Sequence, residues 1–214
     1  MRLSFSFLVL PLLLSACAAQ QRLTPRRAQV AIVAEEEWRG VASTEDVAKI
    51  DGLLPLWEKS LAAARAPGSR PRLAASALLD PKAGLERGAP TPGSYRCKFT
   101  RLGKRSAADR PTALSPEAFC YVGVAEGRLS LTTETGALPL GGWLWDEADG
   151  KRLIFLGAAR TPKMKAPPAY GEDGARNAVG VLERVGEFRF RLAVPAPGGG
   201  EVLYLFELWA MPSL

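Results

Sequence analysis

The side chains available for chemistry in this chain are limited by the absence of histidine, which does not occur among its 214 residues. Without an imidazole there is no Ser–His or Cys–His nucleophile pair and no histidine-ligated zinc or iron. Catalysis would have to use carboxylates, lysine, tyrosine or a Ser–Lys pair. Lys104 and Ser106 are such a pair, but a loop position gives no desolvation to lower a lysine pKa. We therefore expect neither a cofactor nor a metal.

Cys17 ends a segment that has the composition of a secretory signal. Arg2 is followed by the apolar run Leu3–Leu14 and by the small residues Ser15 and Ala16. The run has the length of a signal-peptide core and is too short to span a bilayer as a helix. This ending resembles a bacterial lipobox, in which the signal peptidase cuts after small residues and the cysteine thiol takes a diacylglyceryl group.

Lipidation at Cys17 would place the protein in the cell envelope. Residues 1–16 would be the lipoprotein signal peptide, and residues 17–36 would form a tether. Each buried methylene contributes about 0.8 kcal/mol, so several acyl chains give stable anchoring. Ala18 stands where an aspartate would favour retention in the inner membrane, so we expect the outer membrane, with the domain facing the periplasm. The alternative is an ordinary signal peptide with a chance cysteine.

The charge of the chain limits the partners that we expect. The formal net charge is +6, and the signal segment contains only one of the basic residues, Arg2. A modest excess that is spread along a chain is typical of a solvated surface and not of a nucleic-acid site. We expect the membrane, through the lipid anchor, and either an envelope component or a small apolar ligand as partners, and no nucleic acid.

Cys97 and Cys120 are the two cysteines that follow Cys17. An exported protein folds in an oxidising compartment, which favours a disulfide between an even pair. A metal site is the alternative, but the pair lacks Cys-x-x-Cys spacing and no histidine could complete the site. A bridge that closes this loop would stabilise the fold by about 3 kcal/mol on the chain-entropy model.

Five other residues are candidates for contacts with a ligand. Trp143 and Trp145 lie on one face of a predicted strand, where they could stack on a sugar or an apolar ligand, or simply fill the core. Arg101 and Lys104 belong to a basic loop that could meet membrane phosphates or peptidoglycan carboxylates, or remain solvated. Tyr170 lies in a long segment rich in proline and glycine, which is either a functional loop or a mobile one.

The carboxylates Asp146, Glu147 and Asp149 lie on one predicted turn, where they could bind calcium or act as acid and base. Their spacing is not that of a calcium loop, and turn chemistry accounts for them without a ligand. They are the basis for a hydrolase as one functional alternative.

The elements that must position these residues begin with helices. Ser43 can cap a helix while Asp46 reaches back to it, as in a capping box. Gly52 and Pro55 interrupt the helical pattern, so we expect two short helices that meet near Gly52. A further short helix is predicted over Leu73–Leu79. The apolar stripe at helical spacing consists of Val47, Ile50, Leu54, Trp57 and Leu61.

The chain then changes from a helical period to a period of two, which predicts strands. About eight short, hairpin-linked strands favour an antiparallel meander, closed as a small barrel or packed as a sandwich. The predicted fold class is α+β, mainly β. A helical segment, residues 37–91, would pack on a β domain, residues 92–214, and the two would form one folding unit.

Two hairpins are specific enough to predict a register. A three-residue turn over residues 125–127 would set Tyr121 opposite Leu131. In the last hairpin, matched apolar faces and a matched charge pair would set Arg189 opposite Glu207.

Several short strings in the chain resemble an exported proteobacterial family called domain of unknown function 4893. The resemblance covers about Trp38 to Pro212 and lies in the order and spacing of the strings. It implies export and a pairing of Cys97 with Cys120, and it supplies no catalytic residues because the family has no established activity. The strings are Trp38-Arg39, Ala77-Leu78-Leu79-Asp80-Pro81, Pro92-Gly93-Ser94-Tyr95-Arg96-Cys97, Phe119-Cys120, Thr135-Gly136, Phe155-Leu156-Gly157 and Gly180-Val181-Leu182-Glu183-Arg184-Val185-Gly186.

A more distant likeness concerns small periplasmic barrels that inhibit metalloproteases, which a Gly-x-Tyr start, an early disulfide and a Trp–Asp-Gly hairpin resemble. We expect a non-enzymatic envelope lipoprotein with a binding or scaffold role. The alternatives are a periplasmic protease inhibitor of the small-barrel type, which would use the tether or a rim loop, and a carboxylate-based hydrolase.

Overall fold

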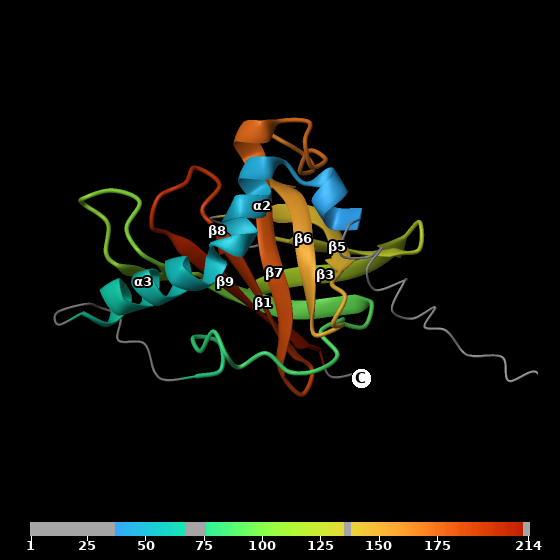
Figure 1. The fold of residues 1–214 in the computed structure, drawn as a ribbon, viewed down its shortest axis with the longest axis horizontal. Helices are drawn as coiled ribbons and strands as arrows, with labels where there is room; N and C mark the ends of the chain where they lie inside the picture. Colours follow the sequence, from blue (N-terminus) through green and yellow to red (C-terminus); the bar gives the residue numbers. More distant parts are fainter. Residues whose placement is uncertain (1–36, 67–75, 135–137, 212–214) are drawn as a thin grey trace, which may run out of the picture.

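The computed structural model describes residues 37–66, 76–134 and 138–211. The predicted signal peptide, Cys17 and the tether lie outside the described residues, as do residues 73–75 of the helix predicted over Leu73–Leu79. The part of that helix that is described forms a turn instead, closed by a hydrogen bond from the Leu79 N–H to the Ser76 carbonyl. Figure 1 shows short helices lying against one side of a β-barrel.

Two helices meet at Gly52, as the glycine and proline predict. They are α2 (Thr44–Asp51) and α3 (Leu53–Arg65). Ser43 caps α2, and its Oγ accepts a hydrogen bond from the Asp46 N–H at 3.1 Å. Pro55 lies in the first turn of α3, where the backbone N–H groups have no helical acceptor, so its missing donor costs no hydrogen bond.

The predicted apolar stripe is wrong at one position. Ile50, Trp57 and Leu61 are buried, but Leu54 is 48% exposed and Leu53 is buried in its place. The break at Gly52 ends one helix and starts another, so helical spacing counted across the break no longer identifies the buried face.

An antiparallel barrel follows the helices. Its order is β2-β1-β3-β4-β5-β6-β7-β8-β9, closed by the pairing of β1 with β9. Eight strands form the closed barrel and the short β2 pairs with one end of β1, which confirms the mainly β fold. The strands are β1 (Gly93–Leu102), β2 (Thr112–Leu114), β3 (Ala118–Ala125), β4 (Arg128–Thr133), β5 (Leu140–Asp146), β6 (Arg152–Ala159), β7 (Asn177–Gly186), β8 (Arg189–Pro195) and β9 (Leu203–Ala210).

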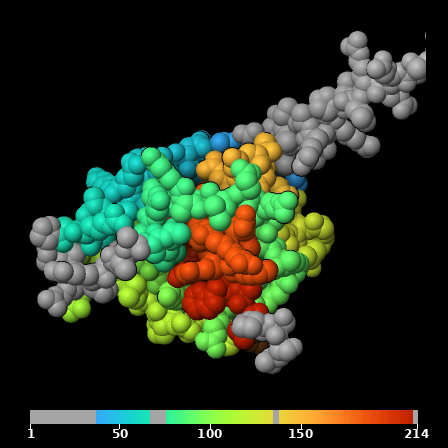
Figure 2. Space-filling view, turned by 90° about the horizontal axis from the view of Figure 1, so that it is seen from below, coloured from blue at the N-terminus to red at the C-terminus, as the bar shows by residue number. Residues whose placement is uncertain are grey.

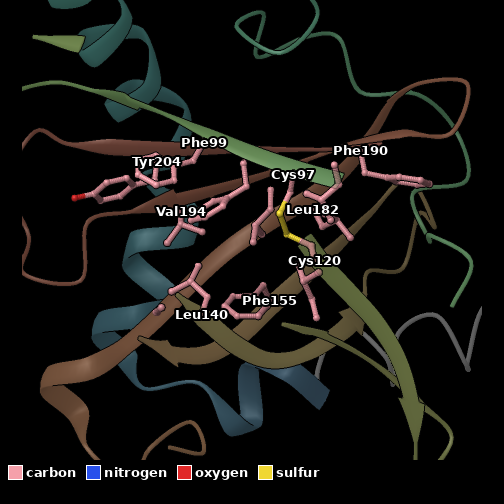
Figure 3. Packing of buried hydrophobic residues seen from close by; sticks show 14 of the residues in the cluster. Cys97, Phe99, Cys120, Leu140, Phe155, Leu182, Phe190, Val194 and Tyr204 are labelled. Carbon is pink, nitrogen blue, oxygen red and sulfur yellow. A yellow bond between two sulfur atoms is a disulfide. The ribbon is translucent and has the colours of Figure 1, made fainter. Parts of the chain in front are cut away.

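Side chains fill the inside of the barrel. Tyr95 packs edge-on against Phe190, with ring centroids 5.9 Å apart, and Phe99 packs against Tyr204 at 5.7 Å. Figure 3 shows Phe99, Tyr204 and Phe190 together with Phe155 between the strands. A barrel of eight strands is just wide enough to be filled in this way, so its interior is a packed core.

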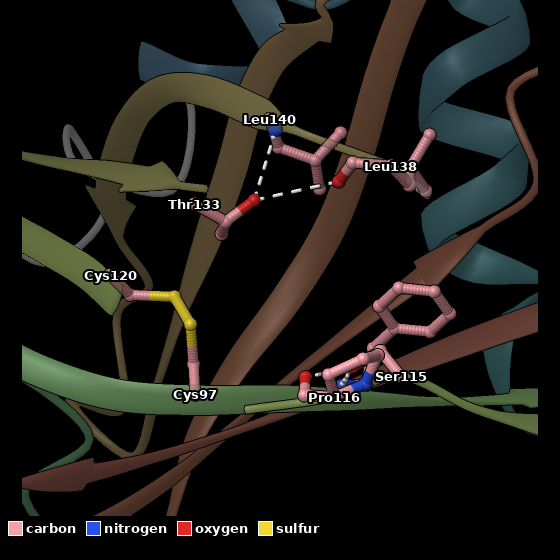
Figure 4. Close-up of a disulfide and its surroundings, with 8 residues drawn as sticks. Cys97, Ser115, Pro116, Cys120, Thr133, Leu138 and Leu140 are labelled. Carbon is pink, nitrogen blue, oxygen red and sulfur yellow. Dashed lines mark hydrogen bonds between the residues drawn. A yellow bond between two sulfur atoms is a disulfide. The ribbon is translucent and has the colours of Figure 1, made fainter. Parts of the chain in front are cut away.

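Cys97 and Cys120 form the predicted disulfide inside the barrel. The bond joins β1 to β3, with the two Cα atoms 5.9 Å apart, and both residues are fully buried. Figure 4 shows it near the Thr133 hydroxyl, which accepts a hydrogen bond from the Leu140 N–H at 3.0 Å. The disulfide therefore ties two neighbouring strands within the core.

A second apolar layer lies between the helices and the outside of the barrel. Trp57 and Leu61 of α3 pack in one buried cluster with the outward side chains Val181 and Leu205. Strand β6 contributes to both layers, because Phe155 points inward while its neighbours point outward. This explains why its sequence is apolar on both faces.

The β3–β4 hairpin turns over two residues and not three, which corrects the predicted register. Glu126 and Gly127 both have positive φ, at 54° and 75°, as in a type I′ turn. Tyr121 therefore lies opposite Thr132 and not opposite Leu131. Glutamate is uncommon in the left-handed region, so the residue types did not indicate this turn.

The register of the last hairpin is also wrong, by two residues. Glu207 lies opposite Arg191 and not opposite Arg189. The strand pairing extends further than expected, because the Ala196 N–H donates to the Val202 carbonyl at 2.9 Å. A shift of two residues leaves every side chain on its own face, so the apolar pattern cannot choose between these registers.

Candidate functional site

The two tryptophans predicted as ligand contacts lie on the outer face of β5, and both are half-buried. Trp145 packs against the outer apolar layer, and the Arg128 guanidinium carbon lies 3.3 Å from its ring centroid. Trp143 stands between Ser130 and Leu156 of the neighbouring strands. Both tryptophans therefore lie on one face of β5, as predicted, but they have different neighbours. Trp145 contacts Arg128, whereas Trp143 lies between two neighbouring strands.

A cavity of about 220 Å³ lies where the β3–β4 hairpin meets the end of β5. Its polar lining comes from Glu37, Glu126, Arg128, Trp145 and Asp146. The Arg128 Nη2 donates to Glu37 Oε1 at 2.5 Å, so residues 91 positions apart meet here. We call this site the Arg128 cavity.

Two buried N–H donors at the Arg128 cavity have no acceptor in the part of the chain that the structure describes. They are Arg128 Nη1 and Trp145 Nε1. A buried donor without a partner costs about 1–3 kcal/mol, and more when it is charged. A cavity that combines a guanidinium, an aromatic ring and unmet donors is a candidate binding site.

The predicted carboxylates divide between this cavity and the turn beside it. Asp146 lines the cavity but is exposed, whereas Glu147 forms a two-pronged ion pair with Arg152. Asp149 accepts a hydrogen bond from the Lys151 N–H at 2.8 Å within the turn. Catalytic acids commonly lie in apolar surroundings, which the exposed Asp146 lacks, so this arrangement gives no support to the hydrolase alternative.

The two predicted basic contacts have different surroundings. Arg101 is 5% exposed, and it donates to the Asp109 carboxylate at 2.6 Å and to the Arg110 carbonyl at 3.0 Å. Lys104 is exposed in the same loop. Arg101 therefore orders the loop from within, and Lys104 is the one of the two that faces solvent.

Tyr170 joins a polar cluster around Asp46 that the sequence did not reveal. The Tyr170 hydroxyl donates to Asp46 Oδ2 at 2.6 Å and accepts from the Ser43 N–H at 2.9 Å. Asn177 Nδ2 and Lys49 Nζ also donate to the Asp46 carboxylate, at 3.1 and 2.9 Å. We call these five residues the Asp46 cluster. The capping pattern identified Ser43 and Asp46, but nothing local in the sequence pointed to the distant partners.

The hydrogen bonds within the Asp46 cluster favour the ionised form of the Asp46 carboxyl group. Burial alone raises the pKa of Asp46, but side-chain hydrogen bonds from Tyr170, Lys49, Ser43 and Asn177 outweigh it and hold the pKa below its ordinary value. Burial and the bond to Asp46 raise the pKa of Tyr170. A carboxylate stabilised as an anion is a weak base, so the cluster is suited to fastening Tyr170 onto α2 and not to proton transfer.

Arg191 is a second buried charge that sequence reasoning missed. Its side chain is fully buried, and it donates to the carbonyls of Ala77 and Asp80 and to the Glu183 carboxylate, at 2.8, 2.5 and 2.5 Å. Burial lowers the pKa of Arg191, and the pairing with Glu183 opposes that effect. Its guanidinium carbon lies 4.3 Å from the Trp57 ring centroid. Two of the strings that carry the family resemblance meet here, since Asp80 and Glu183 belong to them.

A wider groove lies at the end of the barrel where β7 turns into β8. It is lined by residues 91–95, Phe188, Ala210 and Met211, with a volume of about 750 Å³. Figure 2 views the molecule from below, with residues 76–92 in green around the orange-to-red β7–β8 turn and the end of β9. Phe188 is 62% exposed there and has a positive φ of 50°.

Metal ligands do not gather in the described part of the chain. Among residues 37–66, 76–134 and 138–211, no three acidic or cysteine side chains come close enough to hold an ion. None of the helices within these ranges is long and apolar enough to cross a membrane.

The chain matches a known family over nearly the whole described domain. The family model called domain of unknown function 4893 matches residues 38–208, from the residue after Glu37 to the last strand of the barrel. No curated protein and no solved structure matches the chain. The helical layer and the closed barrel thus form one matched unit, and the chain belongs to the family called domain of unknown function 4893.

Proposed function

We propose that this protein is a lipid-anchored binding protein of the cell envelope with a non-enzymatic role. A diacylglyceryl group on Cys17 would hold it at the outer membrane, facing the periplasm. Residues 17–36 would tether the barrel at Glu37, beside the Arg128 cavity. Twenty residues reach at most about 70 Å when fully extended, so the cavity would stay within that distance of the membrane surface.

The observation that carries the binding role is the pair of unmet donors at the Arg128 cavity. Side chains fill the barrel core, so a ligand would bind outside it. The buried Asp46 carboxylate, in contrast, has its hydrogen bonds satisfied within the protein. The Arg128 cavity is instead lined by Arg128 and Trp145, each of which has one enclosed N–H without an acceptor among the described residues.

The anchor is tested by replacing the cysteine that would carry it. The wild-type chain should incorporate labelled palmitate and stay with membranes through salt and carbonate washes, whereas Cys17→Ala should lose the label. Ala18→Asp keeps the acylated cysteine and should move the labelled protein to the inner-membrane fraction. Equal labelling of Cys17→Ala and the wild type, or release of the wild type by carbonate, would contradict the anchor.

The filled barrel also favours a second candidate, a periplasmic protease inhibitor, because such a protein works through its rim or its tether and needs no internal chamber. The test is titration of the full chain against a periplasmic metalloprotease. Inhibition that disappears when residues 18–36 are deleted would support this function, and unchanged protease activity at a large excess of the chain would rule it out.

A further inference from the structure

We infer that the Arg128 cavity binds one pyranose ring of an envelope glycan through its hydroxyl groups. This inference rests on the proposed binding function and names the class of ligand. The cavity measures about 220 Å³. Pockets for drug-sized ligands measure about 300–1,000 Å³, so a single sugar ring is a better match in size than a larger ligand.

The charges around the cavity select the chemistry of the ligand. The unmet donors of Arg128 and Trp145 require oxygen acceptors. The exposed carboxylates of Glu126 and Asp146 can accept hydrogen bonds from donors, and the Glu37 carboxylate is already paired with Arg128. A hydroxyl group both donates and accepts, so a neutral ligand with several hydroxyls satisfies both sets.

Other ligand classes satisfy only part of this lining. An anion would meet Arg128 but would also face three carboxylates, which outnumber the one guanidinium. A cation would leave the N–H groups of Arg128 and Trp145 unmet. A purely apolar ligand would bury donors and acceptors alike without partners, which is costly. The small apolar ligand expected from the sequence therefore fits this cavity less well than a sugar.

The central residues of the cavity are held in place before any ligand binds. Arg128 is paired with Glu37 through Nη2, and its guanidinium stacks on the Trp145 ring. The stacking and the ion pair restrain the Arg128 side chain from two directions. A site whose side chains are ordered in advance loses less conformational entropy on binding. Both unmet donors are enclosed, so a hydroxyl reaches them only if the Arg128 side chain shifts while it keeps its ion pair with Glu37.

The test follows the indole N–H of Trp145 by NMR in the full chain held in detergent micelles, with isothermal titration beside it. Two probes distinguish the source of the glycan. The β-1,4-linked trimer of N-acetylglucosamine represents peptidoglycan-type chains, and delipidated core oligosaccharide represents lipopolysaccharide. The indole signal is assigned by its loss in Trp145→Phe. We expect one probe or both to bind and to move that signal.

Variants then locate the binding. Arg128→Lys keeps the charge but loses the guanidinium fork, and Trp145→Phe keeps a ring but loses the N–H. Each should weaken binding about tenfold, because tenfold corresponds to about 1.4 kcal/mol, a typical value for one hydrogen bond. Trp143→Phe is the matched control on the same face of β5, and it should leave the affinity unchanged.

Three results would overturn the inference. They are an unmoved Trp145 signal with both probes, an affinity that falls in Trp143→Phe but not in the two cavity variants, and inorganic phosphate binding in place of the sugars. None of these results would change the palmitate labelling expected at Cys17. Loss of the glycan inference alone is therefore distinguishable from loss of the lipid anchor.

Discussion

Buried charged side chains hold this domain together through partners from distant parts of the chain. Asp46 on α2 is bonded to Tyr170 and Asn177, which lie 124 and 131 positions away. A capping residue is usually satisfied within its own helix, and Ser43 does bond to Asp46 in that way. Asp46 therefore serves both its helix and the segment that leads into β7.

The ionisation of Asp46 should contribute stability that depends on pH. Its pKa is lowered in the folded state, so the contribution is present above the unfolded value of about 3.9 and is lost as pH falls through the folded value. Asp46→Asn should cost about 1–3 kcal/mol near pH 7, because the amide cannot accept the same set of hydrogen bonds. The two proteins should converge in stability as pH falls below about 4.

Urea unfolding followed by circular dichroism, from about pH 7 to about pH 2.5, measures this convergence. Asp51→Asn is the matched control, because Asp51 is an exposed carboxylate on the same helix and should change stability by less than about 1 kcal/mol. A difference between the wild type and Asp46→Asn that persists unchanged to the lowest pH would show that the cluster does not act through ionisation.

Close packing of neighbouring strands explains why the barrel contains glycine at Gly142. Glycine inside a strand often marks a bend or a bulge, but the β5–β6 register is continuous at Gly141-Gly142. Gly142 lies opposite Gly157, and a Cβ at Gly142 would fall on the backbone of Leu156 and Gly157. The glycine is therefore required by the approach of two strands and not by an irregular backbone.

Gly142→Ala should therefore destabilise the domain by about 1–3 kcal/mol, because two backbones must move apart to admit one methyl group. Gly174→Ala is the control, since its Cβ would meet nothing within 4 Å and its φ is not positive. Urea midpoints of the two variants give the comparison. An alanine at position 142 that is tolerated as well as one at position 174 would show that β5 and β6 can separate without cost.

The turns show which parts of an element can be predicted from its own sequence. Asp149-Gly150 was recognised as a turn, and Gly150 has a φ of 64° there. Glu126 adopts the same left-handed region without being glycine, asparagine or aspartate, so the length of its turn was misjudged. Turn chemistry can be predicted where the usual residues occur and fails where another residue type occupies the left-handed region.

Arg191 connects three parts of the whole molecule. Its guanidinium lies on β8, pairs with Glu183 on β7, binds the carbonyls of Ala77 and Asp80, and contacts Trp57 of α3. A buried guanidinium is costly unless its charge and most of its donors find partners, and Nη1 and Nη2 of Arg191 have them. Arg191 therefore makes the helical layer, the connecting segment and the barrel depend on one another.

Arg191→Met should destabilise the fold by about 3–5 kcal/mol, because it removes one partner of a buried ion pair and frees the two carbonyls. Adding Glu183→Leu should restore part of that loss, since the unpaired carboxylate is then absent. Arg189→Met on the same strand removes an exposed partner of the buried Glu207, which keeps its ion pair with Lys98, so this variant should cost less than Arg191→Met. Free energies of unfolding are measured in urea. Equal losses in Arg191→Met and Arg189→Met would contradict the role of Arg191 in joining the helical layer to the barrel.

The sequence by itself determined those features that depend on neighbouring residues. Ser43 capped a helix, Gly52 and Pro55 divided it, and the period of two placed the apolar faces of the strands inside a mainly β fold. The absence of histidine limited the chemistry in the same direct way. The order of the barrel strands followed from short hairpins.

Only the tertiary structure decided which elements lie opposite one another. It chose between registers of the last hairpin that differ by two residues. It also brought Glu37, Arg128 and Trp145 together around one cavity. The physical reason is that a local pattern reports which face of an element is apolar, but not which partner will cover that face or satisfy its polar groups. The candidate site depends on such partners, so it became visible only in the folded chain.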